Sequence, residues 1–173
     1  MNTKLNILRT ILILLLFMMF GVIFNFSNQN GEKSGNLSRS ITEEVVQKIK
    51  SIQELEGNER EKAVKKVEYI VRKLAHLSLY FIVGILTASL INTYKLKKIN
   101  KIMISFGIGA FYAATDEFHQ LFIPDRSASI IDVGIDSCGV IVGILLIEMA
   151  IIIYKKVAGN NQNCSNHIQK QEI

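Results

Sequence analysis

The sequence predicts an all-α integral membrane protein: a bundle of four transmembrane helices with an amphipathic helical segment between the first and the second. Three observations lead to this fold class. Hydrophobic residues make up 49% of the 173-residue chain and stand in long runs, and a helix needs about 20 of them to cross a bilayer. A single proline and scattered glycines fit helices better than barrel strands, whose apolar residues would alternate. Polar residues within the later runs collect toward one end of each run.

The first apolar run resembles a signal peptide because Lys4 and Arg9 precede it. The run is long, however, and the sequence FNFSNQN that follows it lacks a cleavage pattern of small residues. We therefore expect a retained first helix. The predicted spans are Leu5–Phe26, Leu74–Tyr94, Ile102–Phe122 and Ser129–Tyr154.

Residues 27–72 form a polar segment between the first two spans, with nine Lys and Arg residues and eight Glu. Two sets of apolar residues recur there at helical spacing: Ile41, Val45, Ile49 and Ile52, then Val64, Val67, Ile70 and Val71. Asn30–Gly31 and Gly57–Asn58 are predicted breaks. The pattern favours a helical hairpin that lies on the membrane or on the bundle. A helix that docks a partner protein is the alternative.

Basic residues between the spans predict the orientation of the chain. The short link between the second and third spans carries lysines and no acid, which marks the cytoplasmic side. These lysines are Lys95, Lys97, Lys98 and Lys101. We therefore expect a multi-pass membrane protein with both termini cytoplasmic. Its predicted parts are residues 1–26, an extracytoplasmic segment of residues 27–72, a core of residues 73–154 and a cytoplasmic tail of residues 155–173.

The formal net charge of +5 does not indicate a nucleic-acid-binding protein. Because the lysines stand beside apolar runs and form no single basic face, the expected partner is the lipid bilayer and not nucleic acid. Cys138 and Cys164 lie in the fourth run and in the polar tail, a pattern that predicts neither a structural disulfide nor a cysteine metal site. The sequence predicts no cofactor and leaves the oligomeric state open.

Polar side chains gather at the outer ends of the predicted spans. Asn25, Ser27 and Gln29 mark the outer end of the first span. The others are Lys73, His76 and Tyr80 at the second span, Asp116, Glu117, His119 and Gln120 in the third, and Asp132 and Asp136 in the fourth. Within each span, spacings of three or four residues place most of these side chains on one helix face. Because consecutive spans run in opposite directions, all of them are predicted at the same depth, next to Arg126 in the outer link.

Acids in a membrane span are strongly constrained. Each charge at the bilayer centre costs about 2.5–3.5 kcal/mol on the insertion scale. We therefore expect the four acids to face the bundle interior or a water-filled cleft, paired with Lys73, Arg126 or the histidines.

Two further features concern the fourth span. Gly139 and Gly143, one helical turn apart, predict close packing against another helix. Glu148 lies near the expected inner interface, where we expect it to pair with Lys155 or Lys156.

Three stretches of sequence carry a resemblance to a known family. They are FNFSNQNGEKSGNLS after the first span, RKLAHLSLYFIVG in the second, and DEFHQLFIPDRSASIIDVGIDSCGVIVG across the last two. In these stretches the chain resembles the VanZ-like family of bacterial membrane proteins, over most of residues 24–143. The most specific residues are Asp116, Glu117, His119, Gln120, Pro124, Arg126 and Asp132. Asp125 and Asp136 depart from the family pattern, in which glycine and asparagine are more usual.

The resemblance implies a polytopic envelope protein. The namesake of the family is associated with low-level resistance to the glycopeptide antibiotic teicoplanin, an association that supplies no biochemical activity. Our preferred hypothesis is a binding protein with an outward-facing polar cleft. Its ligand would be lipid-linked or amphipathic, such as a cell-wall precursor or a glycopeptide at the outer leaflet. The expected lining is Lys73, His76, Asp116, Glu117, His119, Gln120, Arg126 and Asp132.

Other interpretations of the same residues remain open. His76 and His119 with Asp116 and Asp132 are of the types that bind zinc or manganese. A hydrogen-bonded network that locks the helices together explains them without a metal, so the sequence predicts no metal site.

Two further hypotheses concern the function of the whole protein. An acid–base pair of Asp116 and His119 would suit a membrane hydrolase or transferase acting on a lipid-linked precursor. Arg126 with Lys73 would suit binding of a phosphate or carboxylate. An accessory protein that docks a partner through residues 27–72 is the third hypothesis.

Overall fold

The computed structural model describes residues 3–28, 41–123 and 129–171 of the chain. Within these ranges every regular element is helical, so the predicted all-α class is confirmed. The helices are α1 (Thr3–Ser27), α3 (Lys50–Gln53), α4 (Gly57–Asn92), α5 (Lys98–Gln120) and α6 (Ile130–Gln171). Residues 41–48 are also helical and precede α3.

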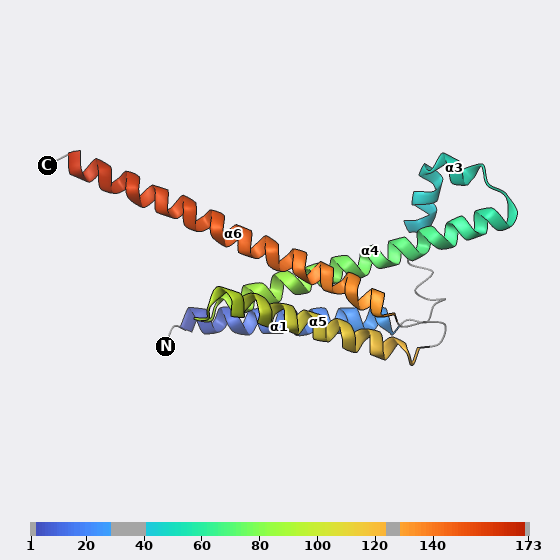
Figure 1. Ribbon diagram of the computed structural model, residues 1–173, viewed down its shortest axis with the longest axis horizontal. Helices are drawn as coiled ribbons and strands as arrows, with labels where there is room; N and C mark the ends of the chain where they lie inside the picture. The colour runs from blue at the N-terminus through green and yellow to red at the C-terminus, as the bar shows by residue number, and fades with distance from the viewer. Residues whose placement is uncertain (1–2, 29–40, 124–128, 172–173) are drawn as a thin grey trace.

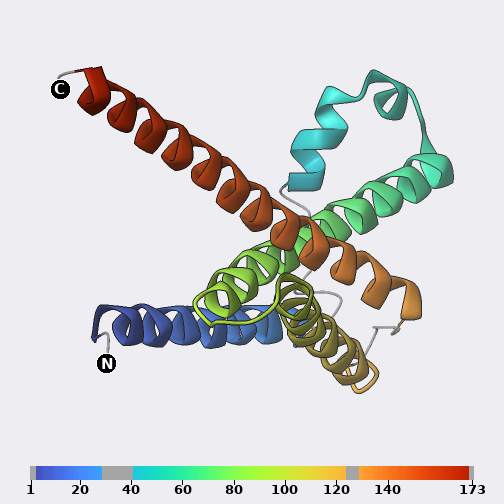
Figure 2. The same ribbon diagram turned by 60° about the vertical axis from the view of Figure 1, so that its left-hand side comes forward.

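The bundle is organised around the crossing of α4 and α6, which share the most extensive helix–helix contact (Figure 1). α1 and α5 pack against α4, and α5 also packs against α6. The N-terminal part of α4 and the C-terminal part of α6 extend beyond the bundle in different directions (Figure 2). Because α1 contacts both α4 and α5, the first apolar run is an integral part of the bundle.

Glycines permit the close crossing of α4 and α6. A Cβ on Gly139 would lie 2.6 Å from a backbone oxygen of α4, and a Cβ on Gly143 would collide with the carbonyl oxygen of Phe81. From the other side, a Cβ on Gly84 would collide with the backbone of Val140. The predicted close packing at Gly139 and Gly143 is therefore confirmed, and Gly84 is its counterpart on α4.

The apolar core is small and surrounds this crossing. Its buried residues are Leu16, Met19, Ile23, Tyr80, Val83, Ala88, Ala113, Val140 and Ile144. They come from all four long helices, so each helix contributes one face to the core and leaves its other faces outside.

Large apolar side chains cover the outer surface of the bundle. Leu14 and Phe17 of α1 are 63% and 68% exposed, and Phe111 of α5 is 73% exposed. A soluble monomer rarely exposes apolar patches of this extent, whereas a hydrocarbon environment requires them. The exposed surface therefore belongs to a membrane protein.

Three helices in the described part of the chain are long and apolar enough to cross a membrane: α1, α4, and α6 through Gly159. The prediction of four spans is supported for these three. α5 is not among them, because Lys98 and Lys101 at its start and Asp116 and Glu117 near its end shorten its apolar part.

The polar segment between the first two spans is helical where it is described. Residues 41–48 and α3 fold back beside the N-terminal part of α4 (Figure 1). Thr42 and Val46 are the buried positions of the short helix, at 1% and 6% exposure, whereas Ile41 is 52% exposed. The buried face of this short helix therefore differs from the predicted one: Thr42 and Val46 pack inward, whereas Ile41 faces outward.

α4 is longer than predicted. It begins at Gly57, whose φ of 57° suits glycine, and continues without a break to Asn92. The predicted amphipathic piece and the predicted second span are therefore one helix. The sequence contains neither proline nor glycine between Asn58 and Val83, so nothing interrupts it there.

Candidate functional site

The ends of three helices meet the middle of α4 at one end of the bundle: Ser27 ends α1, α5 ends nearby, α6 begins there, and Lys73 comes from the middle of α4. Four acids lie there and are buried: Asp116, Glu117, Asp132 and Asp136, between 2% and 6% exposed. We call these four residues the acidic cluster. They come from α5 and α6, which run in opposite directions. Because two of the acids are near the end of α5 and two are near the start of α6, all four lie at the same depth in the bundle.

Lys73 joins α4 to the acidic cluster. Its ammonium group forms an ion pair with Asp132 of α6 and lies 5.3 Å from the centre of the Tyr69 ring. Glu117 has a different partner, because its Oε2 accepts a hydrogen bond of 3.1 Å from the backbone N–H of Ser129. This bond joins the C-terminal end of α5 to the start of α6.

Asp116 joins α5 to α1. Its Oδ2 accepts a hydrogen bond of 2.6 Å from the hydroxyl of Ser27 and one of 3.2 Å from the side-chain amide of Gln120. The same amide lies 3.2 Å from the Ser27 hydroxyl oxygen, which closes a triangle of three buried side chains. The other carboxylate oxygen of Asp116 is buried and has no hydrogen-bond partner among the described residues.

A small pocket opens beside Asp116, between α1 and α5. Its volume is about 190 Å³, and its lining is Phe24, Tyr112, Thr115, Asp116 and His119. The His119 ring stacks on Phe24 with centroids 4.8 Å apart, while its Nε2 is buried and unbonded among the described residues. We call this the α1–α5 pocket. Its lining combines one carboxyl and one imidazole side chain with the rings of Phe24 and Tyr112.

Tyr112, which lines the pocket, lies close to a second tyrosine, Tyr80. Tyr112 donates a hydrogen bond of 2.6 Å to the carbonyl oxygen of Phe20, and the two rings stack at 3.9 Å. Tyr80 of α4 is fully buried with its ring centre 6.4 Å from that of Tyr112. The hydroxyl of Tyr80 has no hydrogen-bond partner in the described ranges. Buried polar atoms without partners are uncommon in native structures, so these mark a place for water or a ligand.

The structure separates the predicted site residues into two groups. Asp116, His119 and Gln120 face α1, whereas Lys73, Glu117 and Asp132 link α4, α5 and α6. His76, Tyr80 and Asp136 are buried at the same end, 7%, 0% and 2% exposed. Arg126 lies outside the described residues. Within the described ranges, no set of three His, Cys, Asp or Glu side chains is arranged to hold a metal ion.

Four residues of this site were absent from the predicted lining: Phe24, Ser27, Tyr112 and Thr115. Ser27 supplies the shortest hydrogen bond to Asp116, and Tyr112 lines the α1–α5 pocket. Tyr112 lies one helical turn before Asp116, so its position on the same helix face could have been inferred from spacing. The alternating helix directions place Ser27 at the depth of this site, but spacing could not pair it with Asp116, because their contact spans 89 positions of the sequence.

The sequence was compared with models of known protein families. The family model described as VanZ/LLP1 matches residues 12–153. The chain belongs to this family. The VanZ/LLP1 match covers most of α1, all of α4 and α5, and the part of α6 that carries Asp132 and Asp136. It also covers the helical segment between α1 and α4, so that segment is part of the VanZ/LLP1 region. No curated protein and no solved structure matches the chain.

Proposed function

We propose that this VanZ/LLP1 protein crosses the bacterial cytoplasmic membrane four times, with α5 as the third span. The 23 residues of α5 extend over about 34 Å at 1.5 Å per residue, close to the thickness of the hydrocarbon core. α5 also exposes apolar side chains outward, as Met103 at 61% and Phe118 at 63% illustrate. Its acids are tolerable because they are buried within the bundle and do not face lipid.

The proposed orientation places the α4–α5 link and both termini in the cytoplasm, and the acidic cluster on the outer side. The lysines of that link support it through the bias of basic residues toward cytoplasmic loops. Labelling of single cysteines tests it, in a variant with Cys138 and Cys164 replaced by serine. Asp125→Cys should react with an impermeant maleimide in intact cells, and Lys97→Cys should react only after lysis. The reverse pattern would overturn the orientation.

The function that we propose is recognition of a lipid-linked or amphipathic ligand at the outer leaflet. The observation that carries it is that Asp116 and His119 line the α1–α5 pocket and that each has a buried atom, Oδ1 and Nε2, without a hydrogen-bond partner in the described residues. Leaving such a buried group unsatisfied costs about 1–3 kcal/mol. A ligand with hydroxyl or ammonium donors would satisfy the carboxylate, and the imidazole would accept or donate a further hydrogen bond.

The surroundings of the pocket suit the apolar part of such a ligand. Phe24 is 46% exposed, and Phe118 and Phe122 near the end of α5 are 63% and 70% exposed. These rings border the polar end of the bundle at the expected membrane interface, where aromatic side chains are common. An acyl chain would lie along them while its head group entered the pocket. A lipid-linked cell-wall precursor and a glycopeptide with an acyl chain both have this chemistry.

Susceptibility to teicoplanin provides a cellular test. We would express the wild type, Asp116→Asn and His119→Ala in a susceptible bacterial host at equal membrane levels. Ser78→Ala is the matched control, because the exposed Ser78 hydroxyl bonds only the Leu74 carbonyl oxygen of its own helix, at 2.8 Å. Reduced susceptibility with the wild type and the control, lost in both site variants, would support the proposal. Equal reduction by all four proteins would exclude the pocket as the site.

A membrane hydrolase or transferase is the second candidate, favoured by one observation. Asp116 and His119 line the same pocket, and His119 retains a buried ring nitrogen without a partner in the described ranges. Such a pair is suited to general acid–base catalysis. Purified protein incubated with a lipid-linked cell-wall precursor should then release phosphate or a head group, and His119→Ala should abolish the release. Stoichiometric binding without turnover would exclude this candidate in favour of the binding protein.

A further inference from the structure

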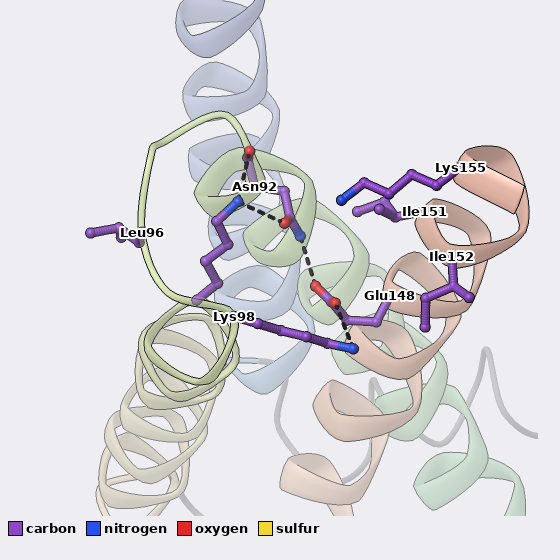
Figure 3. A pocket seen from close by; sticks show the side chains of 8 residues that line it. Asn92, Leu96, Lys98, Glu148, Ile151, Ile152 and Lys155 are labelled. Carbon is purple, nitrogen blue, oxygen red and sulfur yellow. Dashed lines mark hydrogen bonds and ion pairs between the residues drawn. The ribbon is translucent and has the colours of Figure 1, made fainter. Parts of the chain in front are cut away.

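A second polar site lies at the opposite end of the bundle, around the α4–α5 link. A pocket of about 210 Å³ opens there between the link and α6 (Figure 3). Its polar lining is Asn92, Lys98, Lys101, Glu148 and Lys155. We call this the lysine pocket. It shares no residue with the acidic cluster or with the α1–α5 pocket. The inference drawn from it does not depend on the function proposed for the α1–α5 pocket.

Glu148 and Asn92 form the base of the lysine pocket. Glu148 is 8% exposed, and its Oε1 accepts a hydrogen bond of 2.9 Å from the side-chain amide of Asn92. Lys101 donates to the side-chain oxygen of Asn92 at 3.2 Å and to its carbonyl oxygen at 3.3 Å. The partner of Glu148 is thus Asn92, and the expected pairing with Lys155 or Lys156 is replaced by a looser contact of 3.7 Å with Lys98.

The charge of the lysine pocket is unbalanced. Three lysines, from α5 and α6, surround the single carboxylate of Glu148. Lys98 approaches that carboxylate from α5, and Lys155 extends from α6 across the pocket (Figure 3). Lys98 is also the first residue of α5, and its preceding residue makes no side-chain capping bond, so the positive end of the helix dipole adds to the field. Together these charges favour an anion.

The remaining lining of the lysine pocket is apolar. Leu96 is 43% exposed, Ile152 is 53% exposed, and Ile151 lies beside Ile152 on α6. Their exposed surfaces face outward at the end of the apolar part of α6, where the membrane interface is expected. A pocket lined by three lysines on one side and by isoleucines on the other matches a molecule with an anionic head and an acyl chain. Basic pockets between membrane helices are known to bind the head groups of anionic lipids.

The wall of the pocket is held in place from α1. Arg9 donates from Nε to the Thr93 hydroxyl oxygen at 3.0 Å and from Nη2 to the Thr93 carbonyl oxygen at 2.8 Å. Its guanidinium carbon lies 4.1 Å from the centre of the Tyr94 ring. The link that separates Asn92 from Lys98 is therefore fixed before any ligand binds, which lowers the entropy lost on binding.

We propose that the lysine pocket binds the phosphate group of an anionic phospholipid, with the acyl chain of that lipid against Leu96, Ile151 and Ile152. Lys98, Lys101 and Lys155 would bind the phosphate oxygens. Glu148 would hold Asn92 and Lys98 in place and would lower the affinity for the anion by its own charge. The chemistry recognised is a phosphate group, so the experiment must distinguish a lipid from free phosphate.

Native mass spectrometry of the full chain in detergent tests the proposal, with phosphatidylglycerol as the anionic probe and phosphatidylcholine as the zwitterionic one. The test variant is Lys98→Gln/Lys101→Gln/Lys155→Gln. The matched control is Lys95→Gln/Lys97→Gln/Lys156→Gln, which removes three exposed lysines near the pocket that do not line it. The dissociation constant for phosphatidylglycerol should rise about tenfold or more in the test variant and change little in the control.

Three results would overturn the proposal. They are equal weakening in the test and control variants, equal binding of the two lipids by the wild type, and displacement of phosphatidylglycerol by millimolar inorganic phosphate. Glu148→Gln gives an independent test if the triple variant does not fold. Glutamine keeps an oxygen that can accept the hydrogen bond from Asn92 but removes the only acidic charge of the pocket lining. Binding of phosphatidylglycerol should therefore tighten several-fold, and weaker binding in Glu148→Gln would also overturn the assignment.

Discussion

The hydroxyl of Ser27 donates a hydrogen bond of 2.6 Å to Oδ2 of Asp116, across 89 positions of the sequence. Ser27 is the last residue of α1 and is fully buried, and Asp116 lies in the penultimate turn of α5. The bond therefore ties the first helix to the candidate site. The retention of the first helix in the mature protein stays a prediction.

Removing that donor should destabilise the bundle. Ser27→Ala leaves Oδ2 of Asp116 with only the Gln120 amide, and interhelical hydrogen bonds in membranes contribute about 1–2 kcal/mol in model systems. We expect a loss of that size in the free energy of unfolding, measured by titration with dodecyl sulfate in mixed micelles. Thr10→Ala on the same helix is the control, because the exposed Thr10 hydroxyl bonds only its own helix. Equal losses in the two variants would refute the role of Ser27.

The ion pair of Lys73 and Asp132 gives the second prediction. Lys73→Met leaves Asp132 buried beside Glu117 and Asp136 without its partner, and loss of one member of a buried pair costs about 3–5 kcal/mol. Lys73 is 21% exposed in its side chain, so the lower end of that range, about 3 kcal/mol, is expected. The double variant Lys73→Met/Asp132→Asn should be more stable than Lys73→Met alone.

A thermodynamic cycle over these variants measures the coupling energy. The exposed pair of Glu61 and Lys65, which lie 2.7 Å apart on α4, is the control cycle. Solvent screens that pair, so its coupling should be near the limit of detection. A coupling energy for Lys73 and Asp132 no larger than that of the control pair would mean that the ion pair contributes nothing to the site.

Local rules predicted much of the fold. Apolar runs predicted the long helices, and the glycines at positions 139 and 143 predicted a close contact of α6 that the structure confirms with α4. The break predicted at Gly57–Asn58 coincides with the start of α4. Periodicity could not show that the helix continues from there into the second span, because a polar amphipathic helix and an apolar span carry different patterns even when they are continuous. Hydropathy also could not settle α5, whose apolar middle is flanked by charges that tertiary contacts bury or pair.

The sequence predicted the depth of the site in the membrane but not the partner of each side chain. Alternating helix directions place Asp116, Glu117, Asp132 and Asp136 at one end of the bundle, and all four are buried there. Which acid meets which partner depends on the rotation of each helix, which sequence spacing does not define. Thus Glu117 meets a backbone N–H at Ser129, and Glu148 meets Asn92 at the other end. The ligand of the α1–α5 pocket stays a prediction.

The helix crossing gives the third prediction. Gly143→Ala places a methyl group against the carbonyl oxygen of Phe81 and 2.8 Å from the backbone nitrogen of Ile85, so α4 and α6 must separate. Overpacking of this kind costs about 1–3 kcal/mol. Gly134→Ala on the same helix has open space around the new methyl group and should be neutral or stabilising. Unfolding in mixed micelles compares them, and equal stability of the two variants would contradict the crossing.

The last prediction concerns Arg9, whose guanidinium contacts both Thr93 and Tyr94 of the α4–α5 link. Arg9→Met removes both hydrogen bonds and the cation–π contact, while Arg9→Lys cannot reproduce the two-nitrogen geometry of the guanidinium. The link should therefore exchange its amide hydrogens faster in both variants, and most in Arg9→Met. Lys4→Met removes an exposed charge from the same helix and is the control.

Hydrogen exchange read by mass spectrometry on peptides that cover residues 93–97 measures the effect. Since Asn92 precedes the link and Lys98 follows it, a loosened link should also raise the dissociation constant for phosphatidylglycerol while leaving the three pocket lysines in place. Faster exchange with unchanged lipid binding would show that Arg9 fixes the link but has no effect on binding of phosphatidylglycerol. Exchange at the wild-type rate in Arg9→Met would show that α4 and α5 hold the link without α1.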